Sequence, residues 1–376
     1  MSDYLKSNLA KSLGENVLKR FYTTSNEDEK LGEGDLPFLF KVLSINKALS
    51  IQAHPNKTHA KQLHLRDPKN YPDPNHKPEM LVAISEEFEA MCGFRLAEEI
   101  RQHFSSLPEL VSLCDKENVD EFLNSSSESI LRKCFTSMMN KNQDFVSEQF
   151  NKLKLRLSTK PETERSYLDN LYLRLAEQYV NDVGCFSIFL LNCLKLKQGE
   201  AIFLSANIPH AYLFGDGVEC MACSDNVVRA GLTPKFKDVN VLCDMLDYRM
   251  RSSDDNKLMS VRTSLSSNLD YLIEFRPSVD EFSVQQIKIE QKHLSQGQKS
   301  FLIPKSDTGS ILIVIEMNSS ASYFSFNDKK FNANLGLVYY IDALTDVYFN
   351  LESGSNNNQN STILLAFRAY TDIKSN

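Results

Sequence analysis

Four side chains that could bind a metal ion lie in three short segments of the sequence. Gln52 and His54 lie in LSIQAHP, Glu79 lies in HKPE, and His210 lies in ANIPHAY. Two histidines, a carboxylate and an amide oxygen form a nitrogen–oxygen ligand set that suits zinc with one open position, as a catalytic zinc site requires. Taken singly, each prediction is weak, because a lone buried histidine is usually a hydrogen-bonded core residue and a lone glutamate is often a solvated loop charge.

Extended segments are expected to carry these side chains. The alternation in LSIQAHP predicts a β-strand that has Ser50, Gln52 and His54 on one face. HKPE is predicted to be extended, because a proline restricts the backbone of the residue before it, here Lys77. His210 follows a proline at the start of another predicted strand. The ligands would therefore come from separate strands that the fold must bring together.

Two other stretches carry charged residues that could act on a substrate. SDNVVRAGLTPK supplies Arg229 and Lys235, two cations beside a glycine-containing turn, which could hold a phosphate. An ordinary exposed pair is the simpler interpretation. In GDGVE, Asp216 fits a hairpin turn and Glu219 a strand face. CMAC, from Cys220, has no second cysteine pair and is predicted to continue that strand rather than to bind metal.

The hydrophobic pattern changes character several times along the chain. Short apolar and β-branched runs follow Leu36, residues 97–184 show helical spacing, and short strands with turn signals return afterwards. We therefore predict a mainly β protein, with sandwich or barrel domains and an inserted α-helical domain. The expected domains are a discontinuous catalytic domain (1–96 and 185–255), the helical insertion (97–184) and a C-terminal β domain (256–376).

Local signals predict several element boundaries. Asn56 is expected to cap a helix over NKTHAKQLHLRD, and a second short helix is expected after Pro234. The apolar run CFSIFLLNCL, from Cys185, predicts a strand, and Gly199-Glu200 predicts a hairpin.

Composition and charge limit the partners and the compartment. With 376 residues, 42% hydrophobic and 24% charged, the chain has the composition of a globular protein. A net charge of -7 argues against nucleic acid as the main partner but leaves room for a small anionic ligand. The eight scattered cysteines form no disulfide framework, and neither a signal peptide nor a membrane span is recognisable. We expect a cytoplasmic protein with no membrane partner.

Seven motifs, taken in order, resemble those of one family. LPFLFKVLS, LSIQAHPNK, YPDPNHKPEM, CGFR, GEAIFLSANIPHAYL, GDGVECMACSDNVVRAGLTPK and LCDML look like the successive motifs of type I mannose-6-phosphate isomerase, or phosphomannose isomerase. The resemblance implies cupin-type β domains with a helical insertion. It places the zinc ligands on Gln52, His54, Glu79 and His210, and the active-site arginine on Arg229. Other positions at or near the implied sugar-phosphate cleft are Ser50, Lys77, Tyr212, Glu219 and Lys235.

The resemblance implies interconversion of mannose 6-phosphate and fructose 6-phosphate through a cis-enediol, with one zinc ion per chain. Zinc would act as a Lewis acid, and Arg229 would stabilise the enediolate or bind phosphate. Glu219, Lys77 and a zinc-held water are the candidates for the base. The anion contacts would come from Ser50, Lys77 and Lys235. We expect a monomer whose product enters mannose activation for GDP-mannose and glycan synthesis.

The chain departs from the family pattern before Leu36. A tryptophan-bearing WG motif and a motif of the form ELWMGTHP are absent, and the sequence contains no tryptophan. Without those strands, apolar sheet edges are expected to be exposed beside the strand with Gln52 and His54. The alternative function is therefore a non-catalytic zinc-binding cupin that holds a sugar phosphate or a partner. A zinc hydrolase is disfavoured, because no hydrolase signature occurs.

Overall fold

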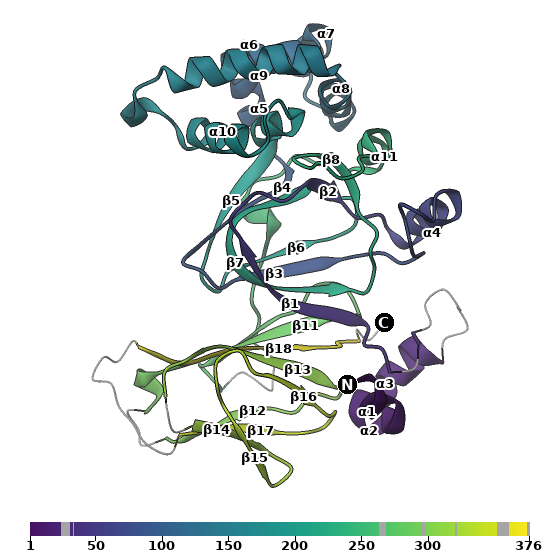
Figure 1. Cartoon of the computed structure of the whole chain (residues 1–376), viewed down its shortest axis with the longest axis vertical. Coiled ribbons are helices and arrows are strands. Elements are labelled where there is room, and N and C mark those ends of the chain that lie inside the picture. The colour runs from purple at the N-terminus through teal and green to yellow at the C-terminus, as the bar shows by residue number, and fades with distance from the viewer. Residues whose placement is uncertain are drawn as a thin grey trace. The chain divides into compact units, whose positions relative to one another are not determined.

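The computed structural model describes residues 1–23, 31–32, 34–262, 268–294, 298–319, 322–351 and 361–373 (Figure 1). The chain divides into two compact units. Unit 1 comprises Met1–Lys41, Val218–Cys223 and Leu258–Asn376, and unit 2 comprises Val42–Gly217 and Ser224–Lys257. No helix among the described residues is both long enough and apolar enough to cross a membrane.

A curled sheet forms the centre of unit 2, and its strands run in the order β5-β4-β7-β3-β6. β2 pairs with both β7 and β8, and β1 also pairs with β7. The strands are β1 (Phe38–Ile45), β2 (Ile51–Ala53), β3 (Glu79–Ala83), β4 (Glu87–Phe94), β5 (Leu191–Lys197), β6 (Ala201–Leu204), β7 (His210–Ala222), β8 (Val228–Gly231) and the short β9 (Lys257–Leu258). β1 and β7 contribute residues to both units.

Both faces of this sheet are covered, because its strands alternate between two apolar cores. On β4, Phe88 and Ala90 belong to one core, whereas Met91 and Phe94 belong to the other. Tyr212 on β7 lies in the core with Phe88. The second core joins the sheet to the helices. This double burial explains why β3 and β4 are almost continuously apolar rather than alternating.

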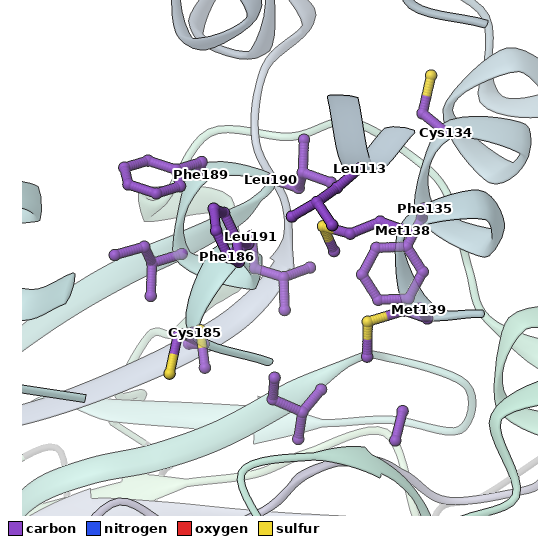
Figure 2. Close-up of a cluster of buried hydrophobic side chains, with 14 of the residues drawn as sticks. Leu113, Cys134, Phe135, Met138, Met139, Cys185, Phe186, Phe189, Leu190 and Leu191 are labelled. Atoms are coloured by element: carbon purple, nitrogen blue, oxygen red, sulfur yellow. The ribbon is translucent and has the colours of Figure 1, made fainter. Parts of the chain in front are cut away.

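The predicted helical insertion is present as a group of helices on one side of the sheet (Figure 1). Figure 2 shows how apolar side chains fix it, with Leu113, Phe135 and Met138 lying near Phe186 and Leu191. The helices are α5 (Ala97–Ser106), α6 (Pro108–Cys114), α7 (Lys116–Asn124), α8 (Glu128–Met139), α9 (Gln143–Ser158), η3 (Glu162–Glu164) and α10 (Tyr167–Gln178). Three further helices of unit 2 are α4 (Lys57–Arg66), α11 (Val239–Met245) and η5 (Asp254–Asn256).

The structure confirms the predicted helix cap at Asn56 and contradicts the predicted strand start at Cys185. The cap of α4 is confirmed, because the side chain of Asn56 accepts a hydrogen bond of 2.9 Å from the backbone of His59. The strand predicted from Cys185 is wrong at its start. A 3-10 helix, η4 (Val183–Phe189), precedes β5. Its residues 184–189 are all buried, and a fully apolar run does not distinguish a strand from a buried helix.

Two turn predictions near glycines are also wrong. Gly199 does occupy a turn, but the strands on either side of it pair with β4 and β3 instead of with each other. Asp216 is not in a hairpin turn, because β7 continues through it to Ala222. Gly215 instead permits a close approach, since a Cβ there would lie 2.7 Å from the carbonyl oxygen of Glu87.

Unit 1 contains two sheets that enclose an apolar core. The five-stranded sheet has the order β10-β11-β18-β13-β16, and the four-stranded sheet has the order β12-β17-β14-β15. Phe301, Phe324 and Phe349 from the second sheet share a core with Leu272 and Leu312 from the first. The strands are β10 (Leu272–Phe275), β11 (Ser283–Glu290), β12 (Ser300–Ile303), β13 (Ser310–Met317), β14 (Ser322–Phe326), β15 (Lys329–Asn332), β16 (Val338–Ile341), β17 (Val347–Leu351) and β18 (Thr362–Tyr370).

Short helices at the N-terminus also belong to unit 1. The carbonyl oxygen of Ser12 accepts hydrogen bonds from the backbone of Ala343 and the hydroxyl of Tyr340, both 3.0 Å long. The helices are α1 (Ser2–Ser7), α2 (Leu9–Leu13), α3 (Glu15–Val17), η1 (Leu18–Tyr22) and, later in the chain, η6 (Gln291–Leu294). The prediction of a mainly β fold with a helical insertion is confirmed, whereas the three domain boundaries stay predictions. The sequence analysis also expects exposed apolar residues in this sheet, and Leu39 and Val42 on β1 are 49% and 47% exposed.

Candidate metal centre

Neighbouring strands place three of the predicted residues in one row. Gln52 on β2 lies directly opposite His210 on β7 and directly opposite Arg229 on β8. Residues that face each other across paired strands have side chains on the same side of the sheet. That side is the one on which Tyr212 also lies, two residues after His210. The row therefore lies on the side opposite the helical insertion.

His54, Glu79 and His210 converge in a buried cluster. His54 Nε2 lies 3.3 Å from Glu79 Oε1, and His210 Nε2 lies 3.6 Å from Glu79 Oε2. One ligand atom of each residue lies within 4.8 Å of the others, and all three residues are at most 2% exposed. Tetrahedral zinc with bonds of about 2.1 Å sets its ligand atoms about 3.4 Å apart, so these spacings fit the ion.

Backbone carbonyls fix the tautomers of both histidines. His54 Nδ1 lies 2.8 Å from the carbonyl oxygen of Asn226, and His210 Nδ1 lies 2.9 Å from that of Ile208. A carbonyl oxygen only accepts, so each Nδ1 carries a proton and donates it. Each ring then turns Nε2 toward the carboxylate of Glu79, and Nε2 is the ring nitrogen left for a metal ion.

The electrostatics of the cluster also favour a cation. Burial lowers the pKa of His54, although Glu79 acts in the opposite direction, so this imidazole is neutral at pH 7. Burial alone would raise the pKa of Glu79, but His54, His210 and Lys77 together hold it well below its ordinary value. Within the described ranges, neither His54 Nε2 nor Glu79 Oε2 makes a hydrogen bond. Two imidazole nitrogens and one carboxylate, buried and close together, form a group that could hold a metal ion.

Gln52 can complete this set through its amide. Its Oε1 accepts a 2.8 Å hydrogen bond from the hydroxyl of Ser50, and its Nε2 lies 3.4 Å from His210 Nε2. A half-turn of the amide exchanges the oxygen and the nitrogen and directs the oxygen at the cluster. The alternation in LSIQAHP thus correctly put Ser50 and Gln52 side by side.

A loop contact that the sequence analysis missed holds His54. The backbone carbonyl of Asn226 accepts the hydrogen bond from His54 Nδ1. The side-chain amide of Asn226 donates hydrogen bonds of 2.6 and 2.9 Å to the carbonyl oxygens of Asp73 and Asn75. The Asp73 carboxylate accepts a 2.8 Å bond from the Ser224 hydroxyl and another of 2.8 Å from the backbone of Asp225. Asp and Asn side chains, as in YPDPN and SDN, often hydrogen-bond to the backbone of loops. These residues were the sequence signal that could have indicated this loop contact.

Arg229 is the cation best placed for an anionic substrate. It is half-buried, and burial lowers the pKa of its guanidinium while Tyr71 acts in the opposite direction. Within the part of the chain that the structure describes, its side chain has no hydrogen bond or ion pair. Tyr71 instead donates a 3.0 Å hydrogen bond to Asp238. Because nothing in this part of the chain neutralises it, Arg229 can bind an anion beside Gln52.

The other predicted residues are distributed unequally around this row. The Lys77 ammonium lies 3.3 Å from Glu79 Oε1 and therefore belongs to the cluster. Tyr212 is 4% exposed and packs edge-on against Phe88. Lys235 is exposed. Glu219 belongs to unit 1, where its carboxylate lies 2.9 Å from the Lys41 ammonium. Their roles at the site stay predictions.

Comparison with known proteins identifies the relatives of this chain. The family model described as phosphomannose isomerase type I, catalytic domain, matches residues 3–97, and the model of the helical insertion domain of the same family matches residues 96–191. Mannose-6-phosphate isomerase of Rattus norvegicus is 43% identical over 315 residues, which cover 81% of this chain and 72% of the relative. The enzyme of Eremothecium gossypii is 39% identical over 370 residues, covering 94% and 82%.

Solved structures agree with these sequence matches. A zinc-bound crystal structure of mannose 6-phosphate isomerase superposes with a TM-score of 0.79 at 28% identity, covering 99% of this chain and 85% of the other. A variant of phosphomannose isomerase from Salmonella typhimurium gives the same values. The predicted fold class, cupin-type β domains with a helical insertion, is confirmed.

Proposed function

The chain belongs to the type I phosphomannose isomerase family, and we propose that it interconverts mannose 6-phosphate and fructose 6-phosphate with the help of one zinc ion. The observation that carries this proposal is the convergence of two Nδ1-protonated histidines on the Glu79 carboxylate, beside the row that ends in Arg229. This arrangement puts a metal-ligand set and a cation on one face of one sheet.

Gln52, His54, Glu79 and His210 would hold the zinc ion. A bound zinc ion supplies Lewis-acid stabilisation of the oxygen on which negative charge develops. The Nδ1 bonds of the histidines to Asn226 and Ile208 keep Nε2 of both rings aimed at the place of the ion, so the two rings need no rearrangement to bind it. The low pKa of Glu79 keeps its carboxylate anionic at neutral pH.

Arg229 is proposed to bind the anionic part of the substrate. Its guanidinium can donate two parallel hydrogen bonds to a phosphate or to an enediolate, a geometry that a lysine ammonium lacks. Ser50 and Lys235 stay candidates for further anion contacts, and Tyr212 for a contact to the sugar. Anchoring the phosphate would keep C1 and C2 of the sugar in place for proton transfer.

The isomerisation needs a group that removes the proton from C2 of mannose 6-phosphate and returns it to C1, while a hydroxyl proton passes from O2 to O1. Lys77, whose Nζ lies 3.3 Å from the carboxylate of Glu79, and a zinc-held water stay candidates for this group; Lys77 must first lose the proton of its ammonium, because only the free amine accepts one. Glu219, the other side chain considered as base, pairs with Lys41 in unit 1.

The test uses the purified full-length chain. We expect close to one zinc ion per chain by elemental analysis, and conversion of mannose 6-phosphate that a chelator abolishes and added zinc restores. Bound zinc without turnover would contradict the proposal and favour the non-catalytic zinc-binding cupin. A chain without zinc would contradict both functions.

Arg229→Ala tests the substrate contact separately from the metal. This variant should keep its zinc and lose at least about 100-fold in kcat/KM, because a charge-assisted contact to the reacting anion is removed. Arg132→Ala is the matched control, since Arg132 is an exposed arginine of α8 that pairs with Asp244. Normal turnover in Arg229→Ala would show that the role given to Arg229 is wrong.

A further inference from the structure

The inner face of the five-stranded sheet in unit 1 changes from apolar to polar along its strands. Leu272, Ile287 and Ala366 face one another across β10, β11 and β18 and belong to the apolar core. The next row on the same face, two residues away on each strand, consists of Glu274, Gln285 and Arg368. These residues are 2%, 4% and 1% exposed. A buried polar row of this kind costs free energy unless its groups are satisfied or used.

Arg368 is the least expected member of this row. Its Nε donates a 2.7 Å hydrogen bond to Gln285 Oε1, and its Nη2 donates another of 2.7 Å to the carbonyl oxygen of Pro304. Its Nη1 is buried and has no hydrogen-bond partner within the described part of the chain. Both bonds go to neutral groups, so no carboxylate hydrogen-bonds to the guanidinium there.

The carboxylate of the row is engaged elsewhere. Glu274 accepts a 2.8 Å hydrogen bond from the hydroxyl of Tyr370, which lies on β18 two residues after Arg368. Burial lowers the pKa of Arg368 to about 10, although Tyr370 and Glu274 act in the opposite direction. Arg368 is therefore still a cation at pH 7, and a buried cation with an open donor is a ready partner for an anion.

A cavity of about 250 Å³ lies against these side chains. Glu274, Gln285, Arg368 and Tyr370 form its buried wall, together with Thr308. The exposed part of its lining includes Arg276, Lys305 and Asp307. The cavity thus leads from solvent to the polar end of the sandwich interior, and all of its lining residues belong to unit 1.

The two cations at the exposed part differ in their availability. Arg276 is held by two hydrogen bonds to the Asp372 carboxylate, of 2.7 and 2.8 Å. The Lys305 side chain has no hydrogen bond or ion pair within the described ranges. Its backbone N–H donates a hydrogen bond to the Asp346 carboxylate. Lys305 can therefore turn toward a ligand that reaches Arg368.

We propose that this cavity is a binding site for a small oxyanion, namely the phosphate or carboxylate group of a metabolite of few carbons. Arg368 lies in the buried wall with Nη1 covered by neighbouring atoms, so this donor reaches the anionic oxygens after a small shift of the side chains over it, and the Lys305 ammonium binds them from the exposed side. The volume is below that of typical drug-sized sites, which run from about 300 Å³ upward, so the ligand is small. This site is additional to the metal centre and does not rest on the proposed isomerase function.

The test measures binding of inorganic phosphate and of malonate to the zinc-loaded full-length chain by calorimetry. The Arg229→Ala variant serves as the parent, because it removes the phosphate contact proposed at the metal centre. We expect saturable binding of at least one of the two anions, with one site per chain. Phosphate alone indicates a phosphorylated ligand, and malonate alone indicates a carboxylate.

Two variants locate the site. Lys305→Gln should weaken binding about tenfold, since one charge-assisted contact is lost, whereas Lys299→Gln, an exposed lysine outside the cavity, should leave it unchanged. Arg368→Lys should abolish binding if it folds. If it does not fold, Lys305→Gln decides alone. The absence of saturable binding of either anion, or binding that Lys305→Gln leaves intact, would overturn the proposal.

Discussion

The position of two protons determines what the candidate metal centre can bind. His54 and His210 each donate Nδ1–H to a backbone carbonyl, so both turn Nε2 toward Glu79. The sequence supplies the residue types, but the tautomer depends on Asn226 and Ile208, of which Asn226 lies far from His54 along the chain. Strand alternation could therefore predict that Gln52 and His54 share a side, yet it could not predict the protonation of the rings.

Glu79→Gln tests the charge of this cluster. The amide keeps the shape of the side chain but removes the anionic oxygen, so affinity for zinc should fall at least about 100-fold, measured by competition with a chelator of known affinity. Glu89→Gln is the matched control, because Glu89 is a buried glutamate on β4 that pairs with Arg174 instead of with histidines. Equal zinc affinity in Glu79→Gln and the wild type would exclude this centre.

At the scale of elements, two loops position His54, one of the proposed metal ligands. The Asp73 carboxylate accepts bonds from Ser224 and from the backbone of Asp225, and Asn226 then presents its carbonyl to His54. We predict that Asp73→Ala lowers zinc affinity by about 10- to 100-fold while the fold is kept, because partners of metal ligands orient them. Zinc competition and circular dichroism measure the two effects.

The same loop offers a control for this prediction. Asp225 is exposed and takes part through its backbone N–H alone, so Asp225→Ala should bind zinc as the wild type does. If Asp73→Ala binds zinc normally, the loop contact has no influence on the ring of His54.

The start of α10 gives a pH-dependent prediction. Asp169 accepts hydrogen bonds from the backbone of Ser166 (3.0 Å) and from Lys160 (2.8 Å), and Ser166 in turn caps the backbone of Asp169. Burial would raise the pKa of Asp169, but Lys160 and Ser166 lower it below its ordinary value. A lowered pKa in the folded state stabilises the protein above the unfolded pKa, and this stability is lost as the pH falls through the folded value.

Asp169→Asn should therefore lower the free energy of unfolding by about 1 to 2 kcal/mol at pH 7, measured by urea denaturation. The difference from the wild type should shrink below about pH 4, where the carboxyl groups of the wild type become protonated too. Asp120→Asn, at an exposed position within α7, is the control. A difference that stays constant down to pH 2 would show that charge at Asp169 contributes nothing.

Elements were predictable from the sequence where a local signal decides the structure. Asn56 could be identified as a helix cap, and the helical spacing after Ala97 identified the insertion. The signals around Gly199 and Asp216 failed, because strand pairing across the sheet, and not the local turn propensity, determines where β6 and β7 run. The contribution of Asp73 and Asn226 was missed for a similar reason, since their contact joins two loops distant in the sequence.

At the scale of the whole molecule, the candidate metal centre belongs to one unit alone. His54, Glu79 and His210 all lie in unit 2, whereas the four-stranded sheet of β12, β17, β14 and β15 lies in unit 1 and shares a core with the five-stranded sheet of that unit. A ligand stabilises those parts of a protein whose opening destroys its site. Removal of the metal should therefore lower the free energy of opening in unit 2 and leave that of unit 1 unchanged.

Hydrogen exchange measured with and without a chelator tests this inequality. At zinc concentrations 1,000 times the dissociation constant, binding adds about 4 kcal/mol to the free energy of opening, so amides of β2, β3 and the start of β7 should exchange faster after removal. Amides of β14 and β17 should be unaffected. At the same zinc concentration Glu79→Gln should respond to the chelator by no more than about 1.4 kcal/mol, because an affinity about 100-fold lower leaves zinc at only about ten times its dissociation constant. Equal acceleration in both units would mean that the metal controls a single opening of the whole chain, contrary to a centre confined to unit 2.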